Sequence, residues 1–312
     1  MNINFRVITG LLATLAVTCT ACKKEASDQP PAPQQPTEQI QVHNTDQNNV
    51  ANETDAVTAD VLASVESNAY FNSRTASILQ TASCDAEAFI DTAAKKISVT
   101  YKGGSCLNGR VRSGKVVVQL TAGNRWKDPG AVLTLTYDSL KVTYGDNKKY
   151  IVLNGTQTLT NESGGRLIDL FLRDTVIHML RSANMSISFE DGTKRNWQVA
   201  RRRVYSHNNG LVITVTGLHT QGTDSGICEW GTNRFGQPFT TSITTPIVLK
   251  QDCNFRITAG TISHHVDAGA ADIQFGLNAG GAPIACPASG NYYFKLTWMP
   301  KTGTPVSVIK PY

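Results

Sequence analysis

Runs of alternating apolar and polar residues recur along most of this chain, and they constrain its fold more than any other feature. They are rich in β-branched and aromatic residues, and Gly, Asn, Asp or Pro closes each run. The clearest runs cover residues 97–101, 115–120, 132–137, 151–159, 185–189, 211–216 and 241–249. Because no clear helical period separates most of them, we expect antiparallel sheets and an all-β fold. The expected arrangement is an antiparallel β-sandwich or two stacked β-units.

Turn sequences support antiparallel pairing of neighbouring strands. Asp191-Gly192 follows a run that ends at Phe189, and Asp-Gly tolerates the positive φ values of a type I′ turn. Residues 144–147 and 233–236 indicate hairpins in the same way. Residues 55–79 carry valine and leucine on one helical face, so we expect a short N-terminal helix packed on the sheet. Residues 167–180 fit a helix or a strand equally well.

The first residues have the layout of an export signal. Arg6 supplies a positive charge, an apolar run follows, and small residues lead to Ala21-Cys22. The apolar run is shorter than the roughly 20 residues that a membrane-spanning helix needs. The sequence ending at Cys22 resembles a lipobox, although Cys19 stands where leucine is usual. A plain secretory signal is the alternative, and it also places the chain outside the cytoplasm.

We therefore expect a lipoprotein signal peptide over residues 1–21 and lipidation of Cys22 after cleavage. Several acyl chains, such as palmitate, on one cysteine give stable membrane anchoring. The expected partner of this end of the chain is a membrane. The expected location is the cell envelope, at the outer membrane, facing the periplasm or the surface.

Residues 22–60 differ from the rest in composition. They contain four prolines among polar residues and no aromatic residue. Such a segment buries too little apolar surface to offset the entropy of ordering, so we predict a disordered tether. A β-rich extracytoplasmic domain is then expected over residues 61–312.

The charges divide between these two parts. The tether has two lysines against seven acidic residues, whereas the domain has 26 Lys and Arg against 17 Asp and Glu. A basic domain outside the cytoplasm favours anionic partners, such as an acidic polysaccharide. No nucleic acid partner is expected there. A net charge of this size is also ordinary for solubility.

Five cysteines follow the tether: Cys84, Cys106, Cys228, Cys253 and Cys286. An oxidising compartment favours disulfides, although spacing alone does not fix their connectivity. Cys106 and Cys286 each lie between a Gly-Gly and a Ser-Gly pair with strands on both sides, which indicates an internal duplication. The economical pairing joins Cys84 to Cys106 and Cys253 to Cys286, each worth about 3–4 kcal/mol in the chain-entropy model. Cys228 is then a buried thiol, or an intermolecular or redox site.

Several stretches together resemble a family of β-rich lipoproteins from Bacteroidota for which no activity is established. The stretches are residues 109–118, 129–130, 153–161, 191–192, 201–203, 231–236 and 244–248, with Cys253. The resemblance covers roughly residues 84–286, and no single motif in it is diagnostic. It implies a lipoprotein, an all-β fold and disulfides, and it implies no mechanism.

Motifs for catalysis are missing from the sequence. No H-E-x-x-H or H-x-H occurs, and His264 and His265 are neighbours that point to opposite faces of a strand. Residues 222–226 depart from the G-x-S-x-G spacing of a nucleophile elbow. We therefore predict no catalytic, cofactor-binding or metal-binding residues and expect no cofactor. A carboxylate pair brought together by the fold stays open.

The strongest candidate for a ligand surface is one strand face formed by Trp197, Arg201, Arg203 and Tyr205. Aromatic rings beside two guanidinium groups can stack on sugars and bind carboxylates or sulfates. The alternative is that the arginines line an exposed sheet face and cover apolar neighbours with their stems.

The leading hypothesis is a non-enzymatic binding or scaffolding module at the cell envelope, with an anionic polysaccharide or an envelope protein as partner. A polysaccharide-active hydrolase with a carboxylate pair is the first alternative. A structural envelope component without a ligand is the second.

Overall fold

The computed structural model describes residues 36–67, 86–91, 93–105, 110–144, 149–286 and 290–312. Cys22, Cys84, Cys106, the signal segment and the turn at 145–148 lie outside these residues, so the first predicted disulfide is not seen. The described chain contains one α-helix, α1 (Pro36–Ser67). The strands are β1 (Ala86–Asp91), β2 (Lys96–Ser105), β3 (Arg110–Ala122), β4 (Ala131–Tyr144), β5 (Lys149–Asn161), β6 (Thr175–Phe189), β7 (Lys194–His207), β8 (Leu211–Gly217), β9 (His219–Gln221), β10 (Asp224–Thr232), β11 (Pro238–Lys250), β12 (Arg256–Val266), β13 (Gly269–Leu277), β14 (Tyr293–Pro300) and β15 (Val306–Pro311). Two short 3₁₀ helices are η1 (Leu167–Phe171) and η2 (Gln251–Cys253).

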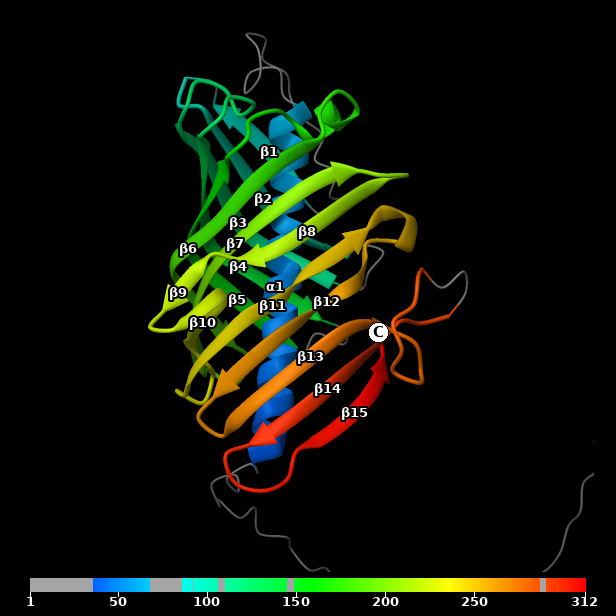
Figure 1. Ribbon diagram of the computed structural model, residues 1–312. Coiled ribbons are helices and arrows are strands. Elements are labelled where there is room, and N and C mark those ends of the chain that lie inside the picture. Colours follow the sequence, from blue (N-terminus) through cyan, green and yellow to red (C-terminus); the bar gives the residue numbers. More distant parts are fainter. Residues whose placement is uncertain (1–35, 68–85, 92, 106–109, 145–148, 287–289) are drawn as a thin grey trace, which may run out of the picture. The chain divides into compact units, whose positions relative to one another are not determined.

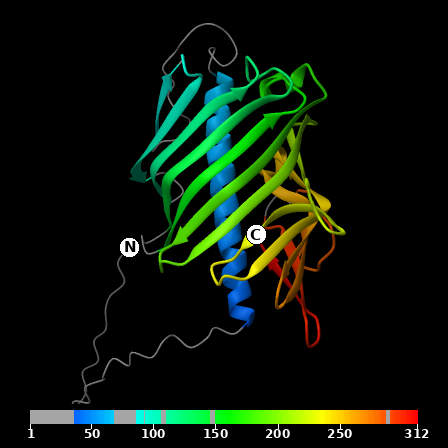
Figure 2. The ribbon, with the colours of Figure 1, turned by 90° about the vertical axis from the view of Figure 1, so that its left-hand side faces the viewer.

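All strand pairs are antiparallel, and they belong to one hydrogen-bonded sheet. Most neighbours in the sequence are neighbours in the sheet, which confirms the predicted all-β antiparallel fold. The turn after Phe189 joins β6 to β7 as expected: the Gly192 amide donates to the Phe189 carbonyl at 3.0 Å, and Gly192 has a φ of 81°. The two halves of the sheet lie on opposite sides of α1 (Figures 1 and 2).

One strand position in the sheet, between β7 and β11, is occupied by two strands, β8 and β10. The second half of β7 pairs with β8, and residues 197–199 of β7 pair with β10 instead. On the other side, β11 pairs with β10 in its first half and with β8 in its second half. β8 and β10 therefore lie end to end between β7 and β11, and the hairpin of β9 and β10 leaves the sheet where they meet.

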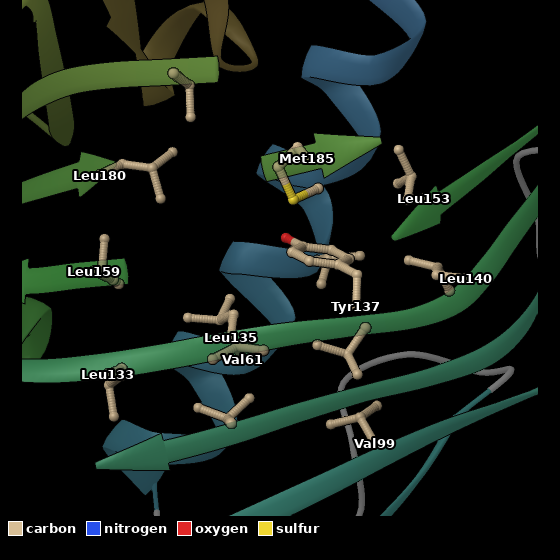
Figure 3. Packing of buried hydrophobic residues seen from close by; sticks show 14 of the residues in the cluster. Val61, Val99, Leu133, Leu135, Tyr137, Leu140, Leu153, Leu159, Leu180 and Met185 are labelled. Carbon is tan, nitrogen blue, oxygen red and sulfur yellow. The ribbon is translucent and has the colours of Figure 1, made fainter. Parts of the chain in front are cut away.

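The hydrophobic core lies between α1 and the face of the sheet that surrounds it. Buried residues alternate along most of β4 and β5, as the period of two in their sequences requires, and the alternation in β4 shifts at a bulge between Tyr137 and Leu140. Figure 3 shows Val61 of α1 among Leu133, Leu135 and Tyr137 of β4, with Met185 of β6 nearby. The Tyr137 hydroxyl is buried with them and donates to Gln157 Oε1 at 2.7 Å.

The helix begins earlier than predicted, and this corrects the boundary of the tether at residue 60. Residues 55–67 are helical as expected, but α1 starts at Pro36, and proline is favoured at a helix start because its missing N–H needs no partner there. The polar composition misled the prediction because α1 buries polar side chains as well as apolar ones. His43, Asp46, Glu53 and Thr58 are among the buried residues of α1.

Residues 167–180, which fitted a helix or a strand, contain both. η1 covers Leu167–Phe171, and β6 begins at Thr175.

The structure contains the disulfide between Cys253 and Cys286 that the sequence predicted. It ties η2 to the segment that connects β13 to β14. Cys228 is a buried free thiol whose Sγ lies 3.3 Å from the Thr241 carbonyl, in agreement with the simplest interpretation of this residue. Burial raises the pKa of the Cys228 thiol, so the reactive thiolate is disfavoured.

Candidate ligand-binding site

The four predicted ligand-surface residues lie inside the domain, under α1. Trp197, Arg201, Arg203 and Tyr205 do share one face of β7, as the alternation predicted, but all four are buried. The expectation that this face is exposed was wrong. Alternation assigns residues to two faces of a strand, and it does not tell which face a helix covers.

Their contacts explain why the arginines are buried. The two guanidinium groups of Arg201 and Arg203 both form ion pairs with Asp55 of α1, and Arg201 also pairs with Glu229 of β10. The indole Nε1 of Trp197 donates to Glu229 Oε2 at 2.9 Å. These residues therefore attach the helix to the sheet, and no free face is left there for a ligand.

The surroundings of Arg203 stabilise its positive charge. Burial alone lowers the pKa of this guanidinium, but the Asp55 carboxylate and Tyr205 outweigh that effect and raise the pKa above its ordinary value.

A pocket lies on the other face of the sheet, beside the point where β8 and β10 meet. Its volume is about 340 Å³, within the range of small-molecule sites. It is lined by Thr156, Thr158, Arg181, Ser182, Val199, Ala200, His219 and Trp230. Gln157 and Leu159 of β5 point into the core, so the threonines on either side of Gln157 point away from α1.

Two glycines allow the β9–β10 hairpin to leave the sheet and form one wall of the pocket. A Cβ on Gly217 would lie 1.9 Å from the carbonyl oxygen of Gly226, so no other residue fits at 217 without a shift of the backbone. The Leu218 amide then donates to the Ala200 carbonyl at 3.0 Å, where β7 changes partner from β10 to β8. Figure 1 shows the hairpin of β9 and β10 beside β5 and β6.

An aromatic pair forms that wall. The rings of His219 and Trp230 are stacked, with centroids 4.0 Å apart and an angle of 13° between their planes. Both side chains are partly exposed. A flat, partly exposed indole that a second ring holds in place is a surface on which the apolar face of a sugar ring can stack.

The polar groups of the pocket come from β5 and β6. Arg181 is exposed, and no hydrogen bond or ion pair occupies its guanidinium within the part of the chain that the structure describes. Ser182 Oγ accepts the Val199 amide at 2.8 Å and fixes the edge of β6 against β7. The pocket thus offers an aromatic wall, a free guanidinium and threonine hydroxyls. None of the residues that line it is acidic, so it has no carboxylate pair for glycoside hydrolysis.

Reasoning from the sequence missed this pocket. Its lining residues come from β5, β6, β7, β9 and β10, and they are spread along the sequence from residue 156 to residue 230. Trp230 could have been noticed as an aromatic residue three positions before the predicted turn at 233–236, but nothing local in the sequence places it next to Arg181.

Comparisons with protein families, curated proteins and solved structures find no match to this chain. Among the residues that the structure describes, no helix has the long apolar stretch that a membrane span requires.

Proposed function

We propose that this chain is an exported lipoprotein of the cell envelope that binds an anionic glycan without catalysing a reaction. The pocket beside β9 and β10 is the proposed binding site. The observation that carries the proposal is the stacked pair of His219 and Trp230 next to the unpaired guanidinium of Arg181.

The geometry favours a sugar that carries a carboxylate or a sulfate group. Trp230 supplies the stacking surface, and Arg181 can donate two parallel hydrogen bonds to a carboxylate or sulfate. Thr156 and Thr158 add hydroxyl groups that can bond to sugar hydroxyls. A pocket of this volume accommodates one or two sugar rings, which is a fitting size for recognition along a longer polymer.

Glycan-array binding followed by calorimetry with a uronic-acid oligosaccharide tests the proposal. We expect Trp230→Ala and Arg181→Gln each to weaken binding about 10- to 100-fold, since loss of a stacking or charge-assisted contact costs roughly 1.5–3 kcal/mol. Trp298→Ala and Arg125→Gln are matched controls, because both residues lie outside the pocket.

Three outcomes separate the parts of the proposal. Equal binding of neutral and anionic sugars, with loss only in Trp230→Ala, would remove the anionic group from it. Binding that neither pocket variant changes would overturn the site. If no glycan binds at all, a structural envelope component is favoured instead, and crosslinking to envelope proteins is the next test.

The membrane anchor is a separate part of the proposal. It is supported by the sequence before Cys22 alone, which lies outside the described residues. Metabolic labelling with an alkyne analogue of palmitate tests it: we expect labelling of the wild type and none of Cys22→Ser. Labelling that survives Cys22→Ser would overturn the assignment of this cysteine.

A further inference from the structure

The loop between β5 and β6 holds three large apolar side chains in solvent. Ile168, Phe171 and Leu172 are 65%, 75% and 89% exposed, whereas Leu170 of the same turn is buried against Val176 and Tyr205. These residues belong to or follow η1, which is drawn in green at the top of Figure 1. A cluster of such side chains at one tip requires an explanation, because single exposed apolar residues are common but clusters mark interaction sites.

The loop is held firmly at its base. Arg166 forms an ion pair with Asp169 at 2.9 Å, and its backbone amide donates to Asp169 Oδ2 at 2.8 Å. The Leu167 amide lies 3.1 Å from both carboxylate oxygens of Glu66 near the end of α1. On the other side, Arg173 Nη2 donates to the Ser163 carbonyl at 3.2 Å. Hydrogen bonds on both sides therefore hold the tip in this exposed conformation.

The size of the tip decides between two kinds of partner. A stable protein–protein interface buries about 800 Å² on each side. A large aromatic side chain contributes only about 150–250 Å², so three apolar side chains, of which one is aromatic, stay below that area. A lipid bilayer requires no minimum contact area, because each apolar side chain that enters the membrane interface contributes its own free energy of transfer.

The charges next to the tip are bound within the loop. Arg166 and Arg173 flank the apolar residues, and their guanidinium groups bond to Asp169 and to the Ser163 carbonyl, respectively. Glu162, Asp169 and Asp174 are the acidic residues of the same loop; Asp169 is paired with Arg166, and Glu162 with Arg202 of β7. The loop is therefore nearly neutral, and its apolar side chains are the main contribution.

We propose that Ile168, Phe171 and Leu172 insert into the interface of a lipid bilayer and dock this end of the domain on a membrane. The loop contacts the end of α1 opposite to Pro36, through Glu66. The proposed membrane contact is therefore at the end of α1 that contains Glu66, opposite to Pro36. This inference does not depend on the glycan pocket.

A tryptophan reporter tests the insertion in the full chain. Leu172→Trp places an indole at the most exposed position of the tip, and Val306→Trp places one at a 56% exposed position of β15. Both variants are mixed with vesicles of phosphatidylcholine and phosphatidylglycerol whose acyl chains carry bromine, and the fluorescence of the wild type is subtracted.

We expect the added fluorescence of Leu172→Trp to shift to the blue and to lose more than half of its intensity, and that of Val306→Trp to stay unchanged. A lipid anchor elsewhere brings both variants to the vesicle equally, so it does not produce this difference. Equal quenching of the two reporters, or no quenching of Leu172→Trp, overturns the proposal. Phe171→Ser in the Leu172→Trp background must reduce the quenching; an unchanged signal also overturns it.

Discussion

Arg234, in the turn between β10 and β11, donates two hydrogen bonds to Asp46 of α1, which lies 188 positions away in the sequence. The Nε–Oδ2 distance is 2.6 Å and the Nη2–Oδ1 distance is 2.7 Å, and both side chains are about nine-tenths buried. Further ion pairs between α1 and the sheet are Glu53–Arg110, Asp55–Arg201, Asp55–Arg203 and Asp60–Arg112. Acidic residues between positions 46 and 60 and arginines of the following sheet are thus partners within one domain.

Removing one member of the Asp46–Arg234 pair should destabilise the domain strongly. Arg234→Met leaves the Asp46 carboxylate buried without its partner, and such a change costs about 3–5 kcal/mol. Burial raises the pKa of Asp46 while Arg234 opposes that effect, so without Arg234 the carboxyl group should take up a proton more readily. Urea unfolding at pH 7.5 measures the free energy of unfolding.

The double variant Asp46→Leu with Arg234→Met removes both charges and should lose less stability than Arg234→Met alone. Arg202→Met is the matched control, because Arg202 pairs with Glu162 at 3.1 Å and both are about one-third exposed. We expect a cost of about 0–1 kcal/mol for it. Equal costs for Arg234→Met and Arg202→Met would show that the buried pair does not hold the helix.

His178 should make the domain sensitive to acid. Its ring lies between Trp126 and Tyr205, with centroids 5.1 and 5.0 Å away. Burial, helped by the charge of Arg203, lowers the pKa of His178 to about 3. Below the ordinary pKa of 6.5, the unfolded chain takes up a proton that the folded chain refuses, so stability falls as the pH falls from 6.5 towards 3.

His178 can change the free energy of unfolding by at most about 1.4 kcal/mol per pH unit. His178→Phe removes the proton uptake, so urea midpoints at pH 7.5 and 5 should differ less in this variant than in the wild type. His265→Phe is the control, because His265 is exposed. The pKa values of His43 and His264 are also lowered, to about 2 and about 3, so part of the pH dependence must remain. A wild type equally stable at both pH values would contradict the prediction.

The sequence indicates the sheet better than it indicates the site, and the reasons are physical. Strand alternation is local, so runs such as residues 151–159 identify β5 directly. It also groups Trp197, Arg201, Arg203 and Tyr205 correctly on one face, but the identity of the inner face depends on α1. Composition predicted disorder for residues 36–60 of α1 because that criterion counts apolar burial, whereas this helix is also held by ion pairs to a sheet that follows it in the chain.

The pocket depends on pairings that no local pattern encodes. The end-to-end arrangement of β8 and β10 requires β7 and β11 each to change partner halfway. Only then does the hairpin that carries His219 and Trp230 lie near Arg181.

Gly217 should be required for the shape of the pocket. In Gly217→Ala the new Cβ would meet the Gly226 carbonyl oxygen at 1.9 Å, so the start of β9 must move and carry His219 away from Trp230. We expect a loss of stability of about 1–3 kcal/mol, typical of overpacking. Tryptophan fluorescence should also change, since Trp230 loses its stacked neighbour.

Gly280→Ala is the matched control, because its Cβ would meet only the tip of the Asn278 side chain, at 3.3 Å. This variant should unfold within about 0.5 kcal/mol of the wild type, as ordinary surface substitutions do. If Gly217→Ala keeps the stability and the fluorescence of the wild type, the close approach of the two glycines is not what positions the hairpin.

The disulfide between Cys253 and Cys286 should contribute substantially to stability. It closes a segment with a separation of 33 residues, and the chain-entropy model gives about 4 kcal/mol for a loop of this size. The variant Cys253→Ala with Cys286→Ala should lose that amount of free energy of unfolding, so its urea midpoint should be lower than that of the wild type. A midpoint equal to that of the wild type would mean that this part of the sheet needs no crosslink.

A reducing agent should lower the urea midpoint of the wild type at least as far as the double substitution does. Any further decrease on reduction of the double variant would report a second bond, which the sequence predicts between Cys84 and Cys106, because Cys228 is a thiol in both proteins.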